Sequence, residues 1–438
     1  MHDLLLRTAI FLFLFSIFSL FMSTASPSPV FAAAEPIQSL TLSSSQTLAA
    51  FAHRTHAFIV KIGRNEITEY CSVPPLFKGT AYTLTDVSFC PVQEGKLAVA
   101  TSTGSIAVLD VSSLTGKQRH PKSLWDAPDS SRAVNRLSWH RSDANLLASA
   151  SQDGKIKIFD LRVSKKESSG LTLACSNDSV ALRDIQCDPF SDHRLASVSD
   201  NGNLVIWDSR NSESPLSRIT AHSSASQTLA WNSAAQHSIA TGGRDKTVKV
   251  WDLRHAEESS AFIRPVHIIQ TASYVARVKW RPHCIDQIAV SLIDRGDIAI
   301  YDVHMPNAAV CLLRGHAENS IIDLDWLGVG LPSDSVGSER GGSRLHNSVS
   351  SPSKSSGRGN LRFNFSLESE HSLPPTPPPM LSQHIFSADK EGKVFLQDIR
   401  CGFFPRQHMS GKVAAFGSGG GIAFHSGSID RVTAMFNS

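Results

Sequence analysis

An internal repeat of about 50 residues most constrains what this chain can fold into. Five segments share an apolar alternating run, a polar turn, a small-residue strand, a tight turn, and a strand that ends in an aromatic or apolar residue and Asp. They span 85–111, 133–162, 180–210, 226–254 and 274–304. The closing aspartates lie at 110, 160, 208, 252 and 302, at intervals of 50, 48, 44 and 50. These intervals are at or slightly above the length of a four-stranded propeller blade.

The spacing within each repeat is even more regular. From the residue that ends the first strand to the closing aspartate there are 21 positions in four repeats and 22 in the fifth; these residues are Phe89, Trp139, Cys187, Trp231 and Trp280. The tight turns QDGK, DNGN and KEGK place glycine where a positive φ is needed between the second and third strands. The spacing predicts consecutive antiparallel strands in every repeat.

A sixth copy is interrupted. Residues 318–327 supply a first strand ending at Trp326, and 384–400 supply two further strands ending at Asp398. The intervening residues 328–383 contain 14 Ser, 7 Pro and 7 Gly among 56. This composition cannot bury enough apolar surface to offset its ordering entropy, so we predict a disordered insertion.

A seventh, degraded copy spans 45–63, and seven blades are the expected ring. The predicted organisation is all-β: blades 1 to 6 and the first strand of blade 7 in 38–327, and the insertion in 328–383. The rest of the last blade and a Gly-rich tail follow in 384–438. The tail segment 412–436 either contributes a closing strand or begins a further unit.

The amino-terminal segment 1–37 is set aside from the fold. Residues 4–22 are strongly apolar and are followed by small residues, as in a signal peptide or short anchor. Asp3 precedes the only nearby positive charge, Arg7, which is unlike a signal sequence. We interpret the segment as a hydrophobic leader or a mis-extended start.

Composition and motifs exclude several classes of function. Lys and Arg number 42 against 39 Asp and Glu, a formal net charge of +3, so nucleic acid is not an expected partner. The seven cysteines are dispersed without a C-x-x-C pair, which predicts free thiols and no metal site. Phosphate-binding loops, nucleophile elbows and metalloprotease motifs are absent from the sequence. We expect no cofactor and no enzymatic activity.

The repeats resemble the WD-repeat family, whose blades often end in Trp-Asp and contain a buried network of His, Ser or Thr, Asp and Trp. The resemblance implies a seven-bladed WD40-type β-propeller. The best copy assigns the network to His222, Thr241, Asp245 and Trp251, with Ser149 and Asp153 matching in another blade. A Ser/His/Asp catalytic triad is the alternative, but recurrence of these residue types at blade spacing favours a structural role.

Four blades end in Asp-x-Arg, at Arg162, Arg210, Arg254 and Arg400. This resembles the box with which propeller substrate receptors of cullin-type ubiquitin ligases grip their adaptor. A solvated arginine paired with a neighbouring blade's carboxylate is the structural alternative. In the insertion, Ser351 and Thr376 each precede proline, which predicts sites for proline-directed phosphorylation.

Segments 239–254 and 266–282 resemble the WD-repeat subunit 24 type of the GATOR or SEA complex, and the resemblance extends over 85–327. It implies a non-catalytic scaffold that binds other WD-repeat subunits and promotes TOR complex 1 signalling when amino acids are available. It also implies a cytoplasmic location, peripheral at the lysosome or vacuole membrane. Members carry a solenoid and a zinc-binding RING-like domain, which we do not expect here because ligand-spaced Cys/His pairs are missing.

Two alternatives remain at this stage. One is a substrate receptor of a cullin-type ubiquitin ligase acting through the Asp-x-Arg endings. The other is a secreted or membrane-anchored propeller in the secretory pathway, for which glycans at Asn177 or Asn364 would be evidence.

Overall fold

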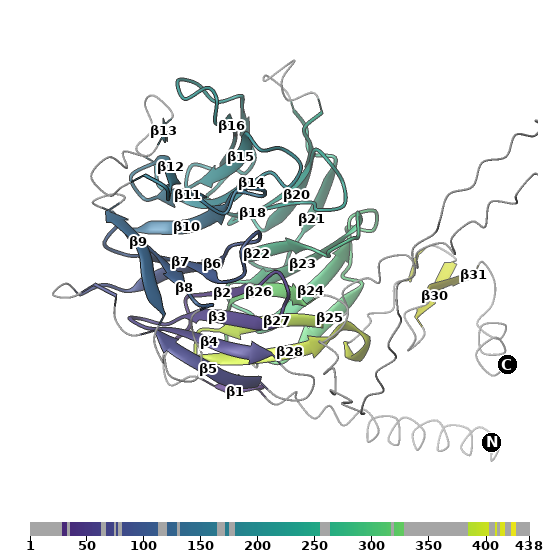
Figure 1. The fold of residues 1–438 in the computed structure, drawn as a ribbon. Helices are drawn as coiled ribbons and strands as arrows, with labels where there is room; N and C mark the ends of the chain where they lie inside the picture. The colour runs from purple at the N-terminus through teal and green to yellow at the C-terminus, as the bar shows by residue number, and fades with distance from the viewer. Residues whose placement is uncertain are drawn as a thin grey trace, which may run out of the picture.

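The protein is a ring of seven four-stranded antiparallel sheets, as the computed structural model shows (Figure 1). The structure describes residues 29–32, 36–62, 67–73, 76–77, 81–112, 121–128, 132–163, 171–174, 180–254, 263–316, 319–327, 384–402, 408–409, 412–416 and 422–425. The prediction of a seven-bladed propeller is confirmed. Within the described residues, no helix is long and apolar enough to cross a membrane.

Each of the first six blades is a meander of four strands consecutive in sequence. Blade 1 comprises β2 (Ser39–Leu42), β3 (Leu48–Ala52), β4 (Ala57–Ile62) and β5 (Ile67–Val73); blade 2 comprises β6 (Leu84–Phe89), β7 (Lys96–Thr101), β8 (Ser105–Asp110) and β9 (Lys122–Pro128). Blade 3 comprises β10 (Val134–Trp139), β11 (Leu146–Ser151), β12 (Lys155–Asp160) and β13 (Leu171–Ala174).

The same order continues around the ring. Blade 4 comprises β14 (Leu182–Cys187), β15 (Arg194–Ser199), β16 (Asn203–Asp208) and β17 (Ser217–Thr220); blade 5 comprises β18 (Ser226–Trp231), β19 (Ser238–Gly243), β20 (Thr247–Asp252) and β21 (His267–Gln270). Blade 6 comprises β22 (Val275–Trp280), β23 (Gln287–Leu292), β24 (Asp297–Asp302) and β25 (Cys311–Arg314). The residues chosen from spacing end the first and third strands as predicted.

Blade 7 joins the two ends of the ring. It contains β26 (Ile321–Leu327), β27 (His384–Asp389) and β28 (Lys393–Asp398), and β1 (Phe31–Ala32) pairs with β28 as its outermost strand. The propeller therefore extends into the segment 1–37 that sequence analysis set aside. Closure by a strand from the other end of the chain leaves the last blade with the same four strands as the others and covers part of its edge.

The carboxy-terminal tail does not supply that closing strand. Strands β29 (His408–Met409), β30 (Lys412–Phe416) and β31 (Ile422–His425) form a separate three-stranded sheet. Between it and β28 lies the 3-10 helix η1 (Ile399–Cys401). The predicted insertion 328–383 lies outside the described residues, between Leu327 and His384, which pair directly across β26 and β27.

The hydrophobic core consists of seven clusters, one at each interface between neighbouring blades. The cluster between blades 7 and 1, for example, joins Phe51 to Phe386, whose ring centroids are 5.8 Å apart. Because both faces of a blade pack on neighbours, the second strand of each blade is buried along nearly its whole length rather than at alternate residues. Glycines of the predicted tight turns, Gly154, Gly202 and Gly392, have φ of 82°, 82° and 88°. The confirmed turns need glycine because a Cβ is unfavourable at positive φ.

Candidate functional site

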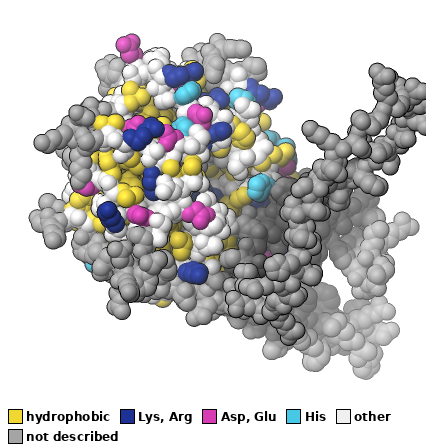
Figure 2. Space-filling view, viewed as in Figure 1, with side chains coloured by type: hydrophobic (Ala, Val, Ile, Leu, Met, Phe, Trp, Pro, Cys, Tyr) yellow, Lys and Arg dark blue, Asp and Glu magenta, His cyan; other side chains and the backbone are white. Residues whose placement is uncertain are grey.

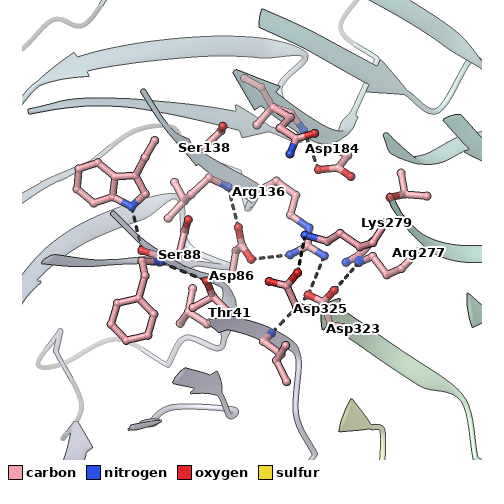
Figure 3. A pocket seen from close by; sticks show the side chains of 18 of the residues that line it. Thr41, Asp86, Ser88, Arg136, Ser138, Asp184, Arg277, Lys279, Asp323 and Asp325 are labelled. Carbon is pink, nitrogen blue, oxygen red and sulfur yellow. Dashed lines mark hydrogen bonds and ion pairs between the residues drawn. The ribbon is translucent and has the colours of Figure 1, made fainter. Parts of the chain in front are cut away.

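The candidate site is a cavity of about 360 Å³ in the channel on the ring axis (Figure 3). The first strand of each blade borders it, and these strands contact one another in sequence, with β26 returning to β2. In six of the seven blades this strand contains a β-bulge near its start. A bulge re-aims the next side chain, and here it directs one residue per blade towards the axis.

These equivalent side chains form a ring of mixed charge. We call them the charged ring, and their order around the axis from blade 1 is Ser39, Asp86, Arg136, Asp184, Thr228, Arg277 and Asp323. In blades 2 to 6 each member lies three positions before the residue that ends the first strand, and in blade 7 Asp323 lies three positions before Trp326. That fixed offset is the sequence signal by which these residues could have been found; sequence analysis used it only to define the repeat.

Arg136 is the centre of the charged ring. Its guanidinium lies 2.6 Å from Asp86 and 3.1 Å from Asp323, whose side chains are 2% and 3% exposed. Burial lowers the pKa of Arg136, but the Asp323 and Asp86 carboxylates outweigh burial and hold that pKa above its ordinary value. Arg277 Nε lies 3.3 Å from the other oxygen of Asp323. One arginine thus links blades 2, 3 and 7 across the channel.

The carboxylates of the ring also join neighbouring blades through the backbone. Asp86 accepts a hydrogen bond from the Leu137 N–H at 2.7 Å, and Asp184 accepts one from the Leu229 N–H at 3.0 Å. Asp323 accepts one from the Leu40 N–H at 3.4 Å, which connects the last blade to the first. Each bond satisfies a donor on the first strand of the next blade.

A second set of side chains lies two positions further along the same strands. We call it the mouth tier; it consists of Thr41, Ser88, Ser138, Gln186, Lys279 and Asp325. Lys279 and Asp325 are 3.9 Å apart, and their side chains are 37% and 30% exposed. The nearby Asp325 carboxylate raises the pKa of Lys279. Because exposure rises from the charged ring to this tier, the cavity opens to solvent on this side.

The tryptophans at the strand ends add bonds between blades. Indole N–H groups of Trp139, Trp231, Trp280 and Trp326 donate to the backbone carbonyls of Ser88, Gln186, Ala230 and Lys279, respectively, each in the preceding blade. The distances range from 2.9 to 3.2 Å. Aromatic residues at this spacing therefore hold adjacent first strands at a fixed separation around the channel.

The four network residues chosen from sequence in blade 5 lie together. His222 Nε2 lies 2.9 Å from the Thr241 hydroxyl, which also accepts a 2.9 Å hydrogen bond from the Trp251 indole. His222 Nδ1 lies 2.9 Å from Asp245. Burial lowers the pKa of His222, and the neighbouring Asp245 carboxylate only partly opposes this shift. The group is enclosed within one blade, away from the residues that line the channel cavity.

Ser149 and Asp153 are not joined in this way. The Ser149 hydroxyl lies 3.5 Å from the Lys157 carbonyl, while Asp153 accepts from the Lys155 N–H. The residues before β10, 129–133, contain no histidine, and Phe159 occupies the position of the tryptophan. Without an imidazole and an indole, serine and aspartate in this blade have separate partners.

A second histidine network, missed from sequence, lies in blade 7. Buried His316 bonds to Asp389 through Nδ1 at 3.0 Å and to Ser387 through Nε2 at 2.8 Å. By its place in the repeat, four positions after Ser387, Glu391 is the counterpart of Asp245. Asp389 lies two residues earlier, at the end of β27, and reaches the ring from there. The spacing between His316 and its partners includes the insertion, so a local sequence pattern could not reveal it.

Each of the four arginines of the Asp-x-Arg endings forms an ion pair within its own blade. Each side chain bonds to the aspartate two residues earlier, in the pairs Arg162–Asp160, Arg210–Asp208, Arg254–Asp252 and Arg400–Asp398. The hydrogen bond from Arg210 lowers the pKa of Asp208. Each of the four arginines therefore pairs with a carboxylate of its own blade. Ser351 and Thr376 lie outside the described residues.

Within the described residues, no group of three or more His, Cys, Asp or Glu side chains is placed to hold a metal ion. Neither Cys187 nor Cys311 is activated, because desolvation raises the pKa of the Cys187 thiol to about 11 and that of the Cys311 thiol to about 12. The channel contains side chains in ion pairs and has a mouth that is open to solvent.

The ring of seven blades, the strand-ending tryptophans and the His–Thr–Asp–Trp network are the features of a WD40-type β-propeller fold. Comparison with known proteins agrees. Residues 118–304 match a family model described as "MIOS, WD40 repeat". A mitotic checkpoint complex crystal structure contains a chain with TM-score 0.55 and 20% identity, covering 68% of this chain and 84% of that one. At that identity the likeness shows the fold alone.

More specific similarity is to GATOR2 subunits. The chain is 32% identical over 234 residues to human "GATOR2 complex protein WDR24", covering 53% of this chain and 28% of that protein. It is 30% identical over 292 residues to Drosophila melanogaster "GATOR2 complex protein Wdr24", covering 66% and 35%. The resemblance inferred from sequence is thereby confirmed. The chain spans about a third of the length of these curated relatives.

Proposed function

We propose that this propeller is a non-catalytic scaffold that assembles with other WD-repeat subunits in a GATOR2-type complex. The observation that carries the proposal is its similarity to WDR24 proteins of two animals, whose names place them in the GATOR2 complex. A third relative, Drosophila "GATOR2 complex protein Wdr59", is 30% identical over 202 residues.

The physical properties of the ring support a scaffold. Each blade packs on both neighbours through an apolar cluster, and its first strand is tied to theirs by hydrogen bonds and ion pairs. A rigid ring holds several exposed loops in fixed relation, which suits simultaneous contact with several proteins. On the face in Figure 2, basic and acidic side chains of the described residues are interspersed rather than gathered by sign, which favours protein partners over nucleic acid.

The finer part of the proposal concerns signalling and location. As a subunit of such a complex, the protein promotes TOR complex 1 signalling when amino acids are available. It acts in the cytoplasm, held at the lysosomal or vacuolar membrane through the complex. No observation favours the ubiquitin-ligase alternative, because Arg162, Arg210, Arg254 and Arg400 are engaged by their own aspartates.

Affinity purification of the tagged full chain from its own cells, with co-purifying proteins identified by mass spectrometry, tests the proposal. We expect stoichiometric recovery of GATOR2-type subunits. The Asp323→Ala variant, in which ring closure is weakened, is purified in parallel as the control. Lower recovery of the subunits with this variant would show that their binding requires a closed propeller. Recovery of a cullin adaptor without those subunits would overturn the proposal, as would recovery of neither.

Loss of the protein should also reduce phosphorylation of a TOR complex 1 substrate on amino-acid refeeding. An unchanged response, with the complex recovered intact, would restrict the proposal to assembly. Location is read separately, by imaging the tagged chain together with a lysosomal or vacuolar marker.

A further inference from the structure

The channel cavity contains more negative than positive charge. Four carboxylates line it, Asp86, Asp184, Asp323 and Asp325, against three cations, Arg136, Arg277 and Lys279. Three of the carboxylates are in ion pairs with these cations. Among the described residues, Asp184 is the lining carboxylate that forms no such pair. One negative charge in the cavity is therefore uncompensated when every group has its ordinary charge.

The position of Asp184 in the charged ring explains its isolation. It lies between Arg136 of blade 3 and Thr228 of blade 5, and the two arginines are engaged elsewhere: Arg136 by Asp86 and Asp323, and Arg277 by Asp323. The Thr228 position has no charge. Arg136 and Lys279 act on Asp184 from a longer range and lower its pKa, but among the described residues no cation of the blade 4 and blade 5 sector forms an ion pair with it.

The Asp184 carboxylate is buried but does face the cavity. It is 8% exposed, and its oxygens accept backbone hydrogen bonds from Ile185 at 2.9 Å and Leu229 at 3.0 Å. Figure 3 shows Asp184 at the edge of the open space around which the arginines and Lys279 gather. Burial raises its pKa, which means that desolvation of the charge is not repaid by the groups present.

We propose that the channel is a binding site for one guanidinium or ammonium group, which enters past Lys279 and Asp325 and is held by Asp184 in the blade 4 and blade 5 sector. The inference is independent of the proposed scaffold function, because it concerns the charge balance of the cavity alone. Carboxylates recognise guanidinium in a planar, two-point geometry, and a desolvated site strengthens that attraction.

The volume and the lining suit such a group. A cavity of about 360 Å³ is within the range of small-ligand sites. Gln186 and Thr228 lie in the same sector and offer uncharged polar atoms beside the carboxylate. Lys279 at the mouth is held towards Asp325, 3.9 Å away, which reduces its repulsion of an entering cation.

Titration calorimetry of the full chain with N-acetyl-arginine amide and N-acetyl-lysine amide tests the site, with N-acetyl-norleucine amide as the uncharged control. We expect saturable binding of the cations and none of the control. Asp184→Asn should weaken binding by about tenfold or more, since it removes the attracting charge. Asp192→Asn, which changes an exposed carboxylate paired with Arg141, should leave affinity unchanged.

Thr228→Lys provides a second variant should Asp184→Asn fail to fold. It places an ammonium group at the uncharged ring position beside Asp184. This group should pair with the Asp184 carboxylate and so abolish binding of the added cation. Absence of saturable binding, equal binding of norleucine amide, or unchanged affinity in either variant would overturn the proposal.

A comparison of a peptide with the capped amino acids distinguishes two sources of the cationic group, a side chain of another protein and a small molecule. A glycine-flanked peptide, Gly-Gly-Arg-Gly-Gly, is titrated beside the capped amino acids. Binding of the peptide at least as tight as that of N-acetyl-arginine amide assigns the site to a side chain of another protein. Binding of the capped amino acid alone assigns it to a small molecule.

Discussion

Thr241 shows how one hydroxyl organises a blade. It lies between the imidazole of His222 and the indole of Trp251, and all three groups are buried. A buried polar atom without a partner is costly, so each member depends on the others. The residue types that suggest a catalytic triad instead form a closed, structural set inside one blade.

Thr241→Val should leave the imidazole and the indole N–H without their shared partner. We expect the free energy of unfolding to fall by about 1–3 kcal/mol, measured by urea denaturation. Thr220→Val, at an exposed position on the outer strand of blade 4, is the matched control and should have little effect. Equal stability of the two variants would contradict the structural role.

His222 should make stability depend on pH. Its pKa is lowered by burial from the ordinary 6.5, so below that pH the unfolded chain binds a proton that the folded chain resists. The contribution of His222 to stability is therefore complete above pH 6.5 and is lost as pH falls towards the folded pKa. Between pH 7.5 and 5.5 we expect wild type to lose more unfolding free energy than His222→Asn. Parallel curves would refute this.

At the scale of the element, two sets of contacts of unequal extent close the ring: the pairing of β1 with β28 and the contacts of Asp323. Among the described residues, strand β1 pairs with Lys393 and Val394 of β28, whereas the outer strands of blades 3 to 6 each pair with four residues. Inside the ring, Asp323 on β26 contacts β2 and β22 and pairs with Arg136 on β10. The interior contacts therefore compensate for a short outer strand.

Asp323→Ala should open this joint. Removing the carboxylate leaves two largely buried arginines with fewer partners, and breaking a buried pair costs about 3–5 kcal/mol. Hydrogen exchange should rise in β2 and β26, the strands that meet there, before it rises in blades 4 and 5. Asp192→Ala removes an exposed pair and is the control. Uniform exchange across all blades would argue against a local joint.

Val30→Pro should loosen the outer strand alone. The Val30 N–H donates to the Val394 carbonyl at 2.8 Å, and proline removes that donor. We expect faster amide exchange in β28 with little change elsewhere. Val30→Ala keeps the N–H and is the matched control. If both variants exchange alike, β1 does not protect the edge of blade 7.

At the scale of the whole molecule, the long insertion occupies a single connection of the ring, the one between β26 and β27. Leu327 and His384 are paired neighbours on β26 and β27 although 56 residues separate them. Contacts that hold blade 7 in place come from its neighbours and from β1. The blade is therefore expected to form whatever the length of this connection.

Replacing residues 328–383 with the six-residue connection 232–237 of blade 5 should leave the ring intact. Loop length changes the cost of closing a loop only logarithmically, so we expect the melting temperature to stay within about 3 °C of wild type. Calorimetric melting and the far-ultraviolet spectrum check this. A large loss of stability would show that the insertion contributes to the fold.

The sequence by itself determined the architecture, because the strand-ending aromatics, turn glycines and closing aspartates recur at fixed spacing and each reports a local geometry. It also determined the His222 network, whose members lie within 30 residues of one another. Three features were decided only by the tertiary structure: closure by Phe31–Ala32, the His316–Asp389 pair, and the charged ring. Closure by β1 and the charged ring join residues that become neighbours only when the chain returns to its starting point around one axis. His316 and Asp389 become neighbours because β26 pairs with β27 across the insertion.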